Sequence, residues 1–207
     1  FQLANAIYPL IQDAAPLQAA IDEYAELYHD KWLRMMSAKL GLSSFRGDTD
    51  TVLIQELEDL LGQVETDMTI FFRRLALLPI DIEVTNNNLW LDYLSDCYYQ
   101  VDELSNDYFD AMSNWLAGYI ERLFSENADF DQRKQNMDKV NPKYVLRNYL
   151  AQQAIDLAHN GDYSMLHQLQ RVLKAPYDEQ PDHEHLAAKR PEWARHKAGC
   201  SMLSCSS

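Results

Sequence analysis

Cysteine is the residue type in this sequence best suited to chemistry. Cys200 and Cys205 stand in AGCSMLSCSS, a C-terminal stretch without helical periodicity. His196 and Lys197 lie just before them, and positive charge near a thiol favours the reactive thiolate. We therefore predict exposed, redox-active cysteines at 200 and 205, with incidental surface cysteines as the alternative. Cys97 falls on an apolar stripe and is predicted to be an inert core residue.

Two carboxylate–histidine pairs have a spacing that is used in metal sites. Glu26 and His29 are separated as in di-iron carboxylate bundles, and Asp156 and His159 repeat the pattern on another predicted helix. Such a bundle would make the protein an oxidoreductase. Both pairs lie off the apolar stripes of their helices, however, so we expect them to face water or a neighbour rather than a bundle core.

The C-terminal region also holds enough ligand types for zinc. These are His183, His185, His196 and Cys200. Their spacing matches no established zinc pattern, and prolines interrupt the segment between them. A solvated tail is the favoured interpretation, and no metal ligand is predicted in the chain.

Phosphate-binding loops are missing from the sequence. The six glycines, at positions 41, 47, 62, 118, 161 and 199, form neither GxGxxG nor GxxxxGK. Neither a GxSxG nor an HExxH motif is present. We predict no catalytic and no cofactor-binding residue in this chain.

The composition limits the kinds of partner that this chain can bind. Eighteen basic and 32 acidic residues give a formal charge of -14, which repels a nucleic-acid backbone. No apolar run approaches the roughly 20 residues that cross a bilayer. Three cysteines make no disulfide framework, so a cytoplasmic location is expected. The chain begins at Phe1 inside an apolar pattern, and we expect further sequence before it.

Apolar residues recur at helical spacing along most of the chain, so the predicted fold class is all-α. We expect a bundle of about eight helices over residues 1–176 and an irregular tail over residues 177–207. Leu3, Ile7 and Leu10 form the stripe of the first helix, and if it is uncovered, dimerisation is expected. The longest helix is predicted over residues 16–40. Further helices are expected near residues 51–64, 67–78, 86–101, 106–123 and 129–140.

A helix–turn–helix pair is predicted over residues 141–176. Asn141 is placed as its cap and Pro142 as its first residue, because proline lacks the amide that a first turn leaves unpaired. Leu146, Leu150, Ala154 and Leu157 then share one face, and Asn160-Gly161 ends the first helix. The pair would also suit a helical protein-interaction module resembling tetratricopeptide repeats, which is the alternative function.

Several segments resemble the SelO family. NPKYVLRNYLAQQAI at 141–155, GDYSMLHQLQRVLKAPY at 161–177, PEW at 191–193 and the terminal SCSS resemble its C-terminal region. DMTIFFRRL at 67–75 and LANAIYPL at 3–10 resemble it more loosely. The similarity runs through the whole chain in order.

That resemblance implies a function. The family has a kinase-like fold and transfers a nucleotide monophosphate from ATP or UTP to hydroxyl side chains of proteins, with Mg or Mn. Its nucleotide-binding, catalytic and metal-binding residues would lie before Phe1, so this chain alone is expected to be inactive and to bind no cofactor. The implied partners are the upstream kinase-like core and the protein substrates.

The resemblance also gives a role to the C-terminal thiol. Cys205, third from the end, matches the family's C-terminal cysteine, which is implied to pair with a cysteine of the kinase-like core. Within this chain, the remaining disulfide would be a strained local one between Cys200 and Cys205. A redox latch at Cys205 is therefore expected.

Overall fold

The computed structural model describes residues 2–197 and 199–200, and within them the chain is helical and has no β-strand. This confirms the all-α prediction. The α-helices are α1 (Gln2–Ile11), α2 (Ala14–Lys39), α3 (Asp48–Gln63), α4 (Met68–Leu75), α5 (Leu91–Leu94), α6 (Asn106–Phe124), α7 (Phe130–Val140), α8 (Asn148–His159) and α9 (Ser164–Val172). The 3₁₀-helices are η1 (Ile82–Asn88), η2 (Ser95–Cys97), η3 (Val101–Glu103), η4 (Pro181–Ala187) and η5 (Glu192–Ala194).

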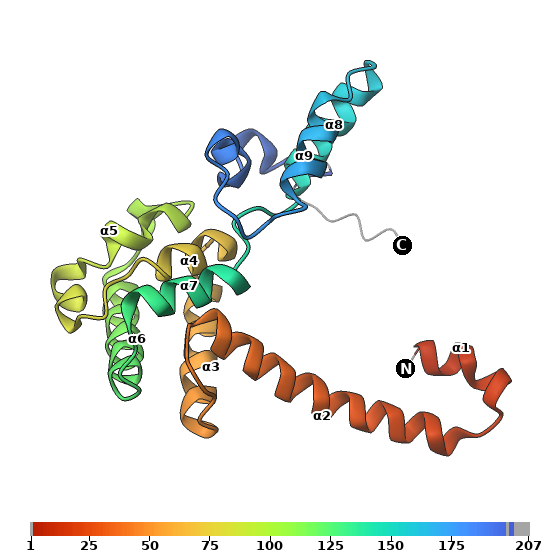
Figure 1. Cartoon of the computed structure of the whole chain (residues 1–207), viewed down its shortest axis with the longest axis horizontal. Helices are drawn as coiled ribbons and strands as arrows, with labels where there is room; N and C mark the ends of the chain where they lie inside the picture. The colour runs from red at the N-terminus through yellow and green to blue at the C-terminus, as the bar shows by residue number, and fades with distance from the viewer. Residues whose placement is uncertain (1, 198, 201–207) are drawn as a thin grey trace.

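Helices α1 and α2 form an arm that projects from the rest of the molecule (Figure 1). The Asp13 carboxylate accepts a hydrogen bond from the Ala15 amide at 3.0 Å and so caps α2. Along the whole of α2 only Leu33, Met36 and Ser37 are buried, and they lie near its C-terminal end. The long helix predicted over residues 16–40 is therefore confirmed, and most of its surface faces solvent.

The main hydrophobic core lies where the end of α2 meets α3, α4, α6 and α7. Trp115 stacks on Tyr119 with ring centroids 5.3 Å apart. The Trp115 indole N–H donates to the Leu53 carbonyl at 2.8 Å, and the Tyr119 hydroxyl donates to the Leu40 carbonyl at 2.6 Å. The polar ends of these buried rings are thus paired, as burial requires.

A buried arginine joins the loop after α2 to the core. Arg122 of α6 donates to Asp50 of α3 at 2.7 Å and to Glu126 at 2.6 Å. It also donates to the Ser44 carbonyl at 2.8 Å. Because a buried charge is tolerated only when paired, these contacts fix the loop between α2 and α3 against α6.

The single helix predicted over residues 86–101 is wrong. The segment contains η1, α5 and η2, and Asn87 and Asn88 have positive φ values of 51° and 58°. Asparagine tolerates this left-handed conformation, which interrupts a helix. Trp90, Leu94 and Cys97 nevertheless reach the core as predicted.

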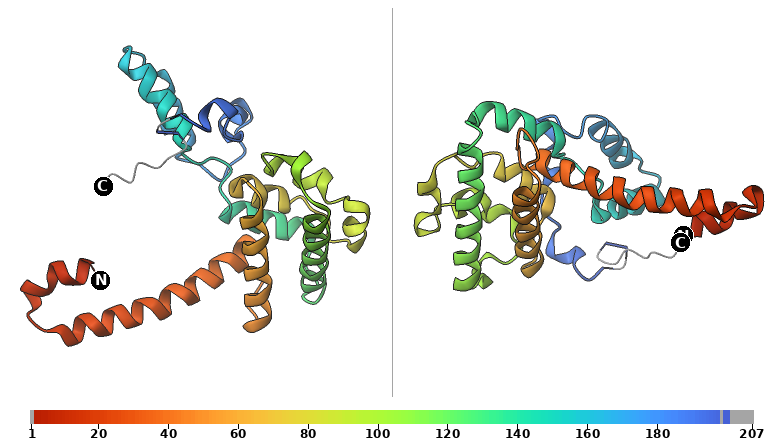
Figure 2. Two further views of the ribbon diagram at one scale, coloured as in Figure 1. Left: turned by 180° about the vertical axis from the view of Figure 1, so that it is seen from behind. Right: turned by 90° about the horizontal axis from the view of Figure 1, so that it is seen from below.

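A second hydrophobic cluster forms around α8 and α9, away from the main core (Figure 2). It contains Leu150, Leu169, Leu186, Ala194 and Cys200. Its members come from both sides of position 176. The division into residues 1–176 and 177–207 stays a prediction.

The predicted helix start at Pro142 is wrong, because α8 begins at Asn148. Asn141 instead exchanges hydrogen bonds with Lys39, accepting from its ammonium and donating to its carbonyl, both at 2.9 Å. The Lys143 and Tyr144 amides donate to the Pro176 carbonyl at 2.8 and 3.0 Å. Residues 142–147 therefore form a non-helical linker, on which Leu146 is exposed.

Within the described part of the chain, no helix is both long enough and apolar enough to cross a membrane.

Candidate functional site

The segment that leads to the C-terminal cysteines is fastened along α8. The Trp193 ring meets the Tyr149 ring edge to face, with centroids 6.2 Å apart. The Lys197 ammonium lies 2.9 Å from the Asp156 carboxylate and 5.5 Å from the centre of the Trp193 ring. This ion pair lowers the pKa of Asp156 and raises that of Lys197, in each case mainly through the hydrogen bond between them. Residues 193–197 thus follow the surface of α8.

Cys200 lies at the end of this fastened segment. Its side chain belongs to the second hydrophobic cluster, and the residue is only 5% exposed. Its amide donates to the Lys197 carbonyl at 3.0 Å. Gly199 precedes it with φ +82°, and a Cβ there would lie 2.7 Å from the Gln152 side-chain oxygen, so glycine suits this approach to α8.

The prediction of an exposed Cys200 is therefore wrong. The cause is the helical pair α8–α9, which provides an apolar surface that the local sequence around position 200 does not reveal. Cys205 lies outside the described residues. The redox role of both cysteines stays a prediction.

Cys97 is fully buried in the main core, as predicted. Burial raises the pKa of its thiol to about 12, and the neighbouring Lys189 offsets only part of this effect. The thiolate is the reactive form of cysteine, so this buried thiol is unreactive near neutral pH.

The two carboxylate–histidine pairs lie on different helices and face solvent. Glu26 and His29 are exposed on the arm, and Asp156 and His159 are exposed on α8. The Asp156 carboxylate is bound to Lys197. Among the described residues, no three histidine, cysteine or acidic side chains are gathered to hold a metal ion. The geometry of a di-metal bundle is not found there.

The tail histidines make a polar contact with α9. The Gln168 side-chain nitrogen lies 3.2 Å from Nδ1 of His183 and 3.5 Å from Nε2 of His185. Cys200 instead packs in the hydrophobic cluster. Of the four candidate zinc ligands, His183 and His185 thus contact α9, His196 is exposed, and Cys200 lies in an apolar core.

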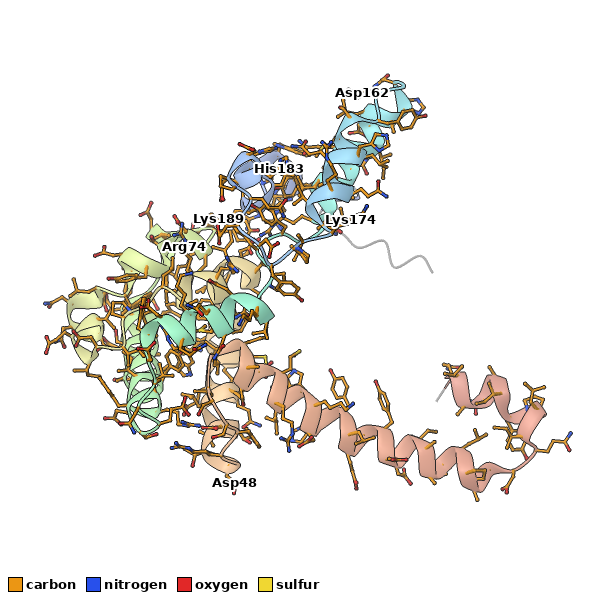
Figure 3. The ribbon with its side chains drawn as sticks, viewed as in Figure 1. Asp48, Arg74, Asp162, Lys174, His183 and Lys189 are labelled. Carbon is orange, nitrogen blue, oxygen red and sulfur yellow. The ribbon has the colours of Figure 1, made fainter. Side chains whose placement is uncertain are left out.

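One face of the arm carries exposed apolar side chains. Tyr24 and Tyr28 are 67% and 59% exposed, and their rings stack with centroids 6.0 Å apart. Leu27 and Met35 on the same helix are also exposed. Figure 3 shows the arm projecting from the body, with side chains extending to both sides of α2 along its length. Large apolar side chains that gather in this way on one helix are typical of an interaction surface.

Comparison with protein families decides where the chain belongs. The family model described as protein adenylyltransferase SelO matches residues 1–174. The chain belongs to the SelO family. This confirms the resemblance that was drawn from the segments quoted above.

Curated SelO-family relatives match this chain along its whole length. A protein nucleotidyltransferase YdiU of Rhodopirellula baltica is 47% identical over 215 residues, covering 99% of this chain and 39% of the relative. A protein of the same name from Aromatoleum aromaticum is 48% identical over 206 residues, covering 100% of this chain and 38% of the relative. The chain thus spans less than two fifths of the length of these relatives.

Sequence reasoning missed the residues that fasten the tail. Tyr149, Gln152 and Asp156 stand on α8 at spacings of three and four, which places them on one face of the helix. Trp193 and Lys197 repeat the spacing of four in the tail. The sequence shows both spacings, but it does not show that these two segments, about 40 residues apart, pack against each other.

Proposed function

We propose that this chain is the helical C-terminal part of a SelO-type protein nucleotidyltransferase. The full-length enzyme transfers AMP from ATP, or UMP from UTP, to serine, threonine or tyrosine hydroxyls of proteins in the cytoplasm. The chain supports the kinase-like part of the enzyme and supplies a redox-regulatory thiol. The observation that carries this proposal is the family match over residues 1–174.

The division of labour follows from the chemistry. The target hydroxyl oxygen bonds to the α-phosphorus, the bond to the leaving pyrophosphate breaks, and the hydroxyl proton passes to a base. This reaction needs groups that hold a triphosphate and Mg or Mn. The described residues gather no three-ligand group for a metal ion, and the sequence has no phosphate-binding loop. We therefore place nucleotide and metal binding in the kinase-like part, outside this chain.

The exposed face of α2 supplies the contact with that part. Its apolar side chains, with Tyr24 and Tyr28 at the centre, have no covering element among the described residues. Packing them against the kinase-like part removes apolar surface from water, at roughly 25 cal/mol per Å². In its absence, two copies of this chain cover the same surface, and a homodimer results.

The redox function is assigned to Cys205. Cys200 is packed in the second cluster, so an oxidant or a partner thiol reaches it only after the tail detaches from α8. In a disulfide with the kinase-like part, Cys205 loses one proton and one electron and so does the partner thiol, with both electrons passing to an external oxidant. The tail would then hold the two parts together.

Activity is tested with the full-length enzyme and the 207-residue chain side by side. Each is incubated with α-labelled ATP or UTP, Mg or Mn and a protein acceptor. Label is expected to enter protein only with the full-length enzyme. Transfer by residues 1–207 alone would overturn the proposed division of labour.

The redox assignment is tested by non-reducing peptide mapping of the oxidised full-length enzyme. Cys205→Ser is expected to abolish the cross-link, and Cys200→Ser, the matched control, is expected to retain it. A wild-type enzyme whose Cys205 stays a free thiol under oxidising conditions would remove this role.

A further inference from the structure

The molecule contains two units with separate hydrophobic cores. The body comprises residues 33–140, from the C-terminal end of α2 through α7, and holds the main core. The distal unit comprises residues 142–200 and holds the second cluster. The two clusters share no residue. Within the described residues, each unit therefore has its own apolar core.

One covalent crossing connects the two units. The chain leaves the body after α7 and enters the distal unit through residues 142–147, which form no helix. The Lys143 and Tyr144 amides bind the Pro176 carbonyl, so this linker is tied to the distal unit. Rotation about the backbone near Asn141 and Pro142 therefore carries the distal unit as a whole.

The contact between the units is made largely by charges. Glu65 and Asp67 stand just before α4 on the body. Arg195 and Arg190 of the distal unit reach the Glu65 carboxylate at 2.9 and 2.5 Å, and Arg147 binds Asp67. We call these five residues the carboxylate latch. Two neighbouring carboxylates of one unit thus hold three arginines of the other.

The rest of the seam is polar and incompletely filled. A cavity of about 580 Å³ lies within it, and nine of its fourteen lining residues are charged. Arg74 of the body and Lys189 of the distal unit both line it, and Figure 3 labels them near one another. In the latch itself, the Nε atoms of Arg147 and Arg190 are buried and have no hydrogen-bond partner within the described structure. A seam with unpaired donors and an open polar cavity resists separation far less than a close-packed apolar core.

We infer that the distal unit pivots on the body about the backbone of Asn141 and Pro142, and that the carboxylate latch sets the fraction of molecules in the docked position. Undocking breaks the latch and the other polar contacts across the seam, which include Arg73 with Glu179 and Lys189 with the Tyr98 carbonyl, and it leaves both apolar cores intact. The distal unit carries Cys200 and the start of the C-terminal tail, so the latch also controls where that tail is presented. The inference does not depend on the proposed enzymatic function.

The test measures a distance between the units in the full 207-residue chain. Spin labels are attached through unnatural amino acids at two exposed positions, Gln55 on α3 and Asp162 between α8 and α9, so that no cysteine is changed. Pulsed electron paramagnetic resonance then gives the distance distribution. The latch variant carries Glu65→Gln and Asp67→Asn. Asn at position 67 still accepts the Ile70 amide, so the cap of α4 is retained.

The matched control carries Glu83→Gln and Asp30→Asn, which remove the same charge at exposed positions outside the latch. In the latch variant, the population outside the docked distance is expected to rise about fivefold, in keeping with loss of the partly exposed pairs of Glu65 and the buried pair of Asp67. The control is expected to match the parent. An equal rise in the control would refute the role of the latch.

Salt provides a second measurement on the unaltered sequence. Raising ionic strength from about 0.05 to about 1 M shortens the screening length to about 3 Å and should enlarge the same undocked population. One narrow distribution at both salt concentrations and in the latch variant would show a single rigid body. That result would overturn the inference. If the latch variant does not fold, the salt series decides alone.

Discussion

Helices α2 and α6 are built from similar side chains and have opposite environments. Helix α6 has 19 residues and buries eight of them, whereas α2 has 26 residues and buries three. Tyr119 of α6 is fully buried with its hydroxyl bonded to a backbone carbonyl, while Tyr24 and Tyr28 of α2 extend into solvent. An apolar stripe therefore shows which face of a helix can be buried, but not whether its partner lies in the same chain.

This difference explains how the two helices contribute to the molecule. In proteins, most helical stability comes from packing of an apolar face rather than from intrinsic propensity. Helix α6 has such packing in the body. Helix α2 has it only near its C-terminal end, so its outer half gains no such packing within the described residues.

The largest contrast should come from equal truncations in the two regions. Leu57 in α3 is fully buried, and Leu57→Ala is expected to lower the free energy of unfolding by about 3 kcal/mol, because it removes packed methyl groups and leaves a cavity. Leu27 on the arm is 47% exposed, and Leu27→Ala should change that free energy by less than about 0.5 kcal/mol. Urea denaturation of both variants, at dilutions where the isolated chain is monomeric, measures this, and equal losses would mean that the arm is packed in solution.

Two glycines with positive φ give a smaller contrast between the body and the α8–α9 turn. At Gly41 a Cβ would lie 2.7 Å from Cγ of Arg133 and 2.8 Å from Cγ of Met137. Arg133 donates hydrogen bonds to the Ala76 and Leu78 carbonyls after α4, so its side chain cannot easily move away from an added Cβ. Gly41→Ala is expected to lower the free energy of unfolding by about 3 kcal/mol, because steric overlap adds to the conformational strain of a positive φ.

Gly161 has φ +82°, and no atom lies within 4 Å of an added Cβ. Gly161→Ala should therefore lower the free energy of unfolding by about 1 kcal/mol, through conformational strain alone. Thermal unfolding of the two variants compares them. A Gly41→Ala protein as stable as the Gly161→Ala protein would show that the body is less tightly packed than described.

The smallest effect on stability should come from lowering the pH. Desolvation raises the pKa of Glu126, but hydrogen bonds from the Ser43 amide and from Arg122 outweigh it, and the net pKa lies below its usual value. A carboxyl group with a lowered pKa in the folded state stabilises the protein above its unfolded pKa of about 4.3. That stabilisation is lost as the pH falls through the lower, folded pKa.

Glu126→Gln should therefore narrow the difference in unfolding free energy between about pH 6 and about pH 3. Glu121→Gln, at an exposed position of α6, is the matched control and should leave that difference nearly unchanged. Identical pH profiles for wild type and Glu126→Gln would contradict the assignment.

Much of the helical layout was readable from the sequence because start signals and periodicity agreed. Ser105 caps α6 as predicted, accepting from the Tyr108 amide at 3.2 Å. Errors arose where a tertiary contact competed with a local signal. Asn141 looked like a cap for the following helix, but its side chain is taken by Lys39 at the end of α2.

The candidate site was less predictable for a related reason. Cys200 looks mobile in sequence, because glycine, serine and histidine surround it. Its burial depends on Trp193 and Lys197 meeting Tyr149 and Asp156 of α8. The local sequence around Cys200 does not indicate that pairing. The exposed arm shows the converse case, in which a strong local stripe has no matching surface among the described residues.

The proposed docking of α2 against the kinase-like part is tested most directly by hydroxyl-radical footprinting of Tyr24 and Tyr28. The isolated chain is compared with the full-length enzyme, at dilutions where the isolated chain is monomeric, and Tyr163 of the α8–α9 turn serves as an exposed reference. Oxidation of Tyr24 and Tyr28 relative to Tyr163 is expected to fall by about tenfold in the full-length enzyme, as for side chains moved from water into a packed interface. Equal oxidation in the two proteins would contradict the account.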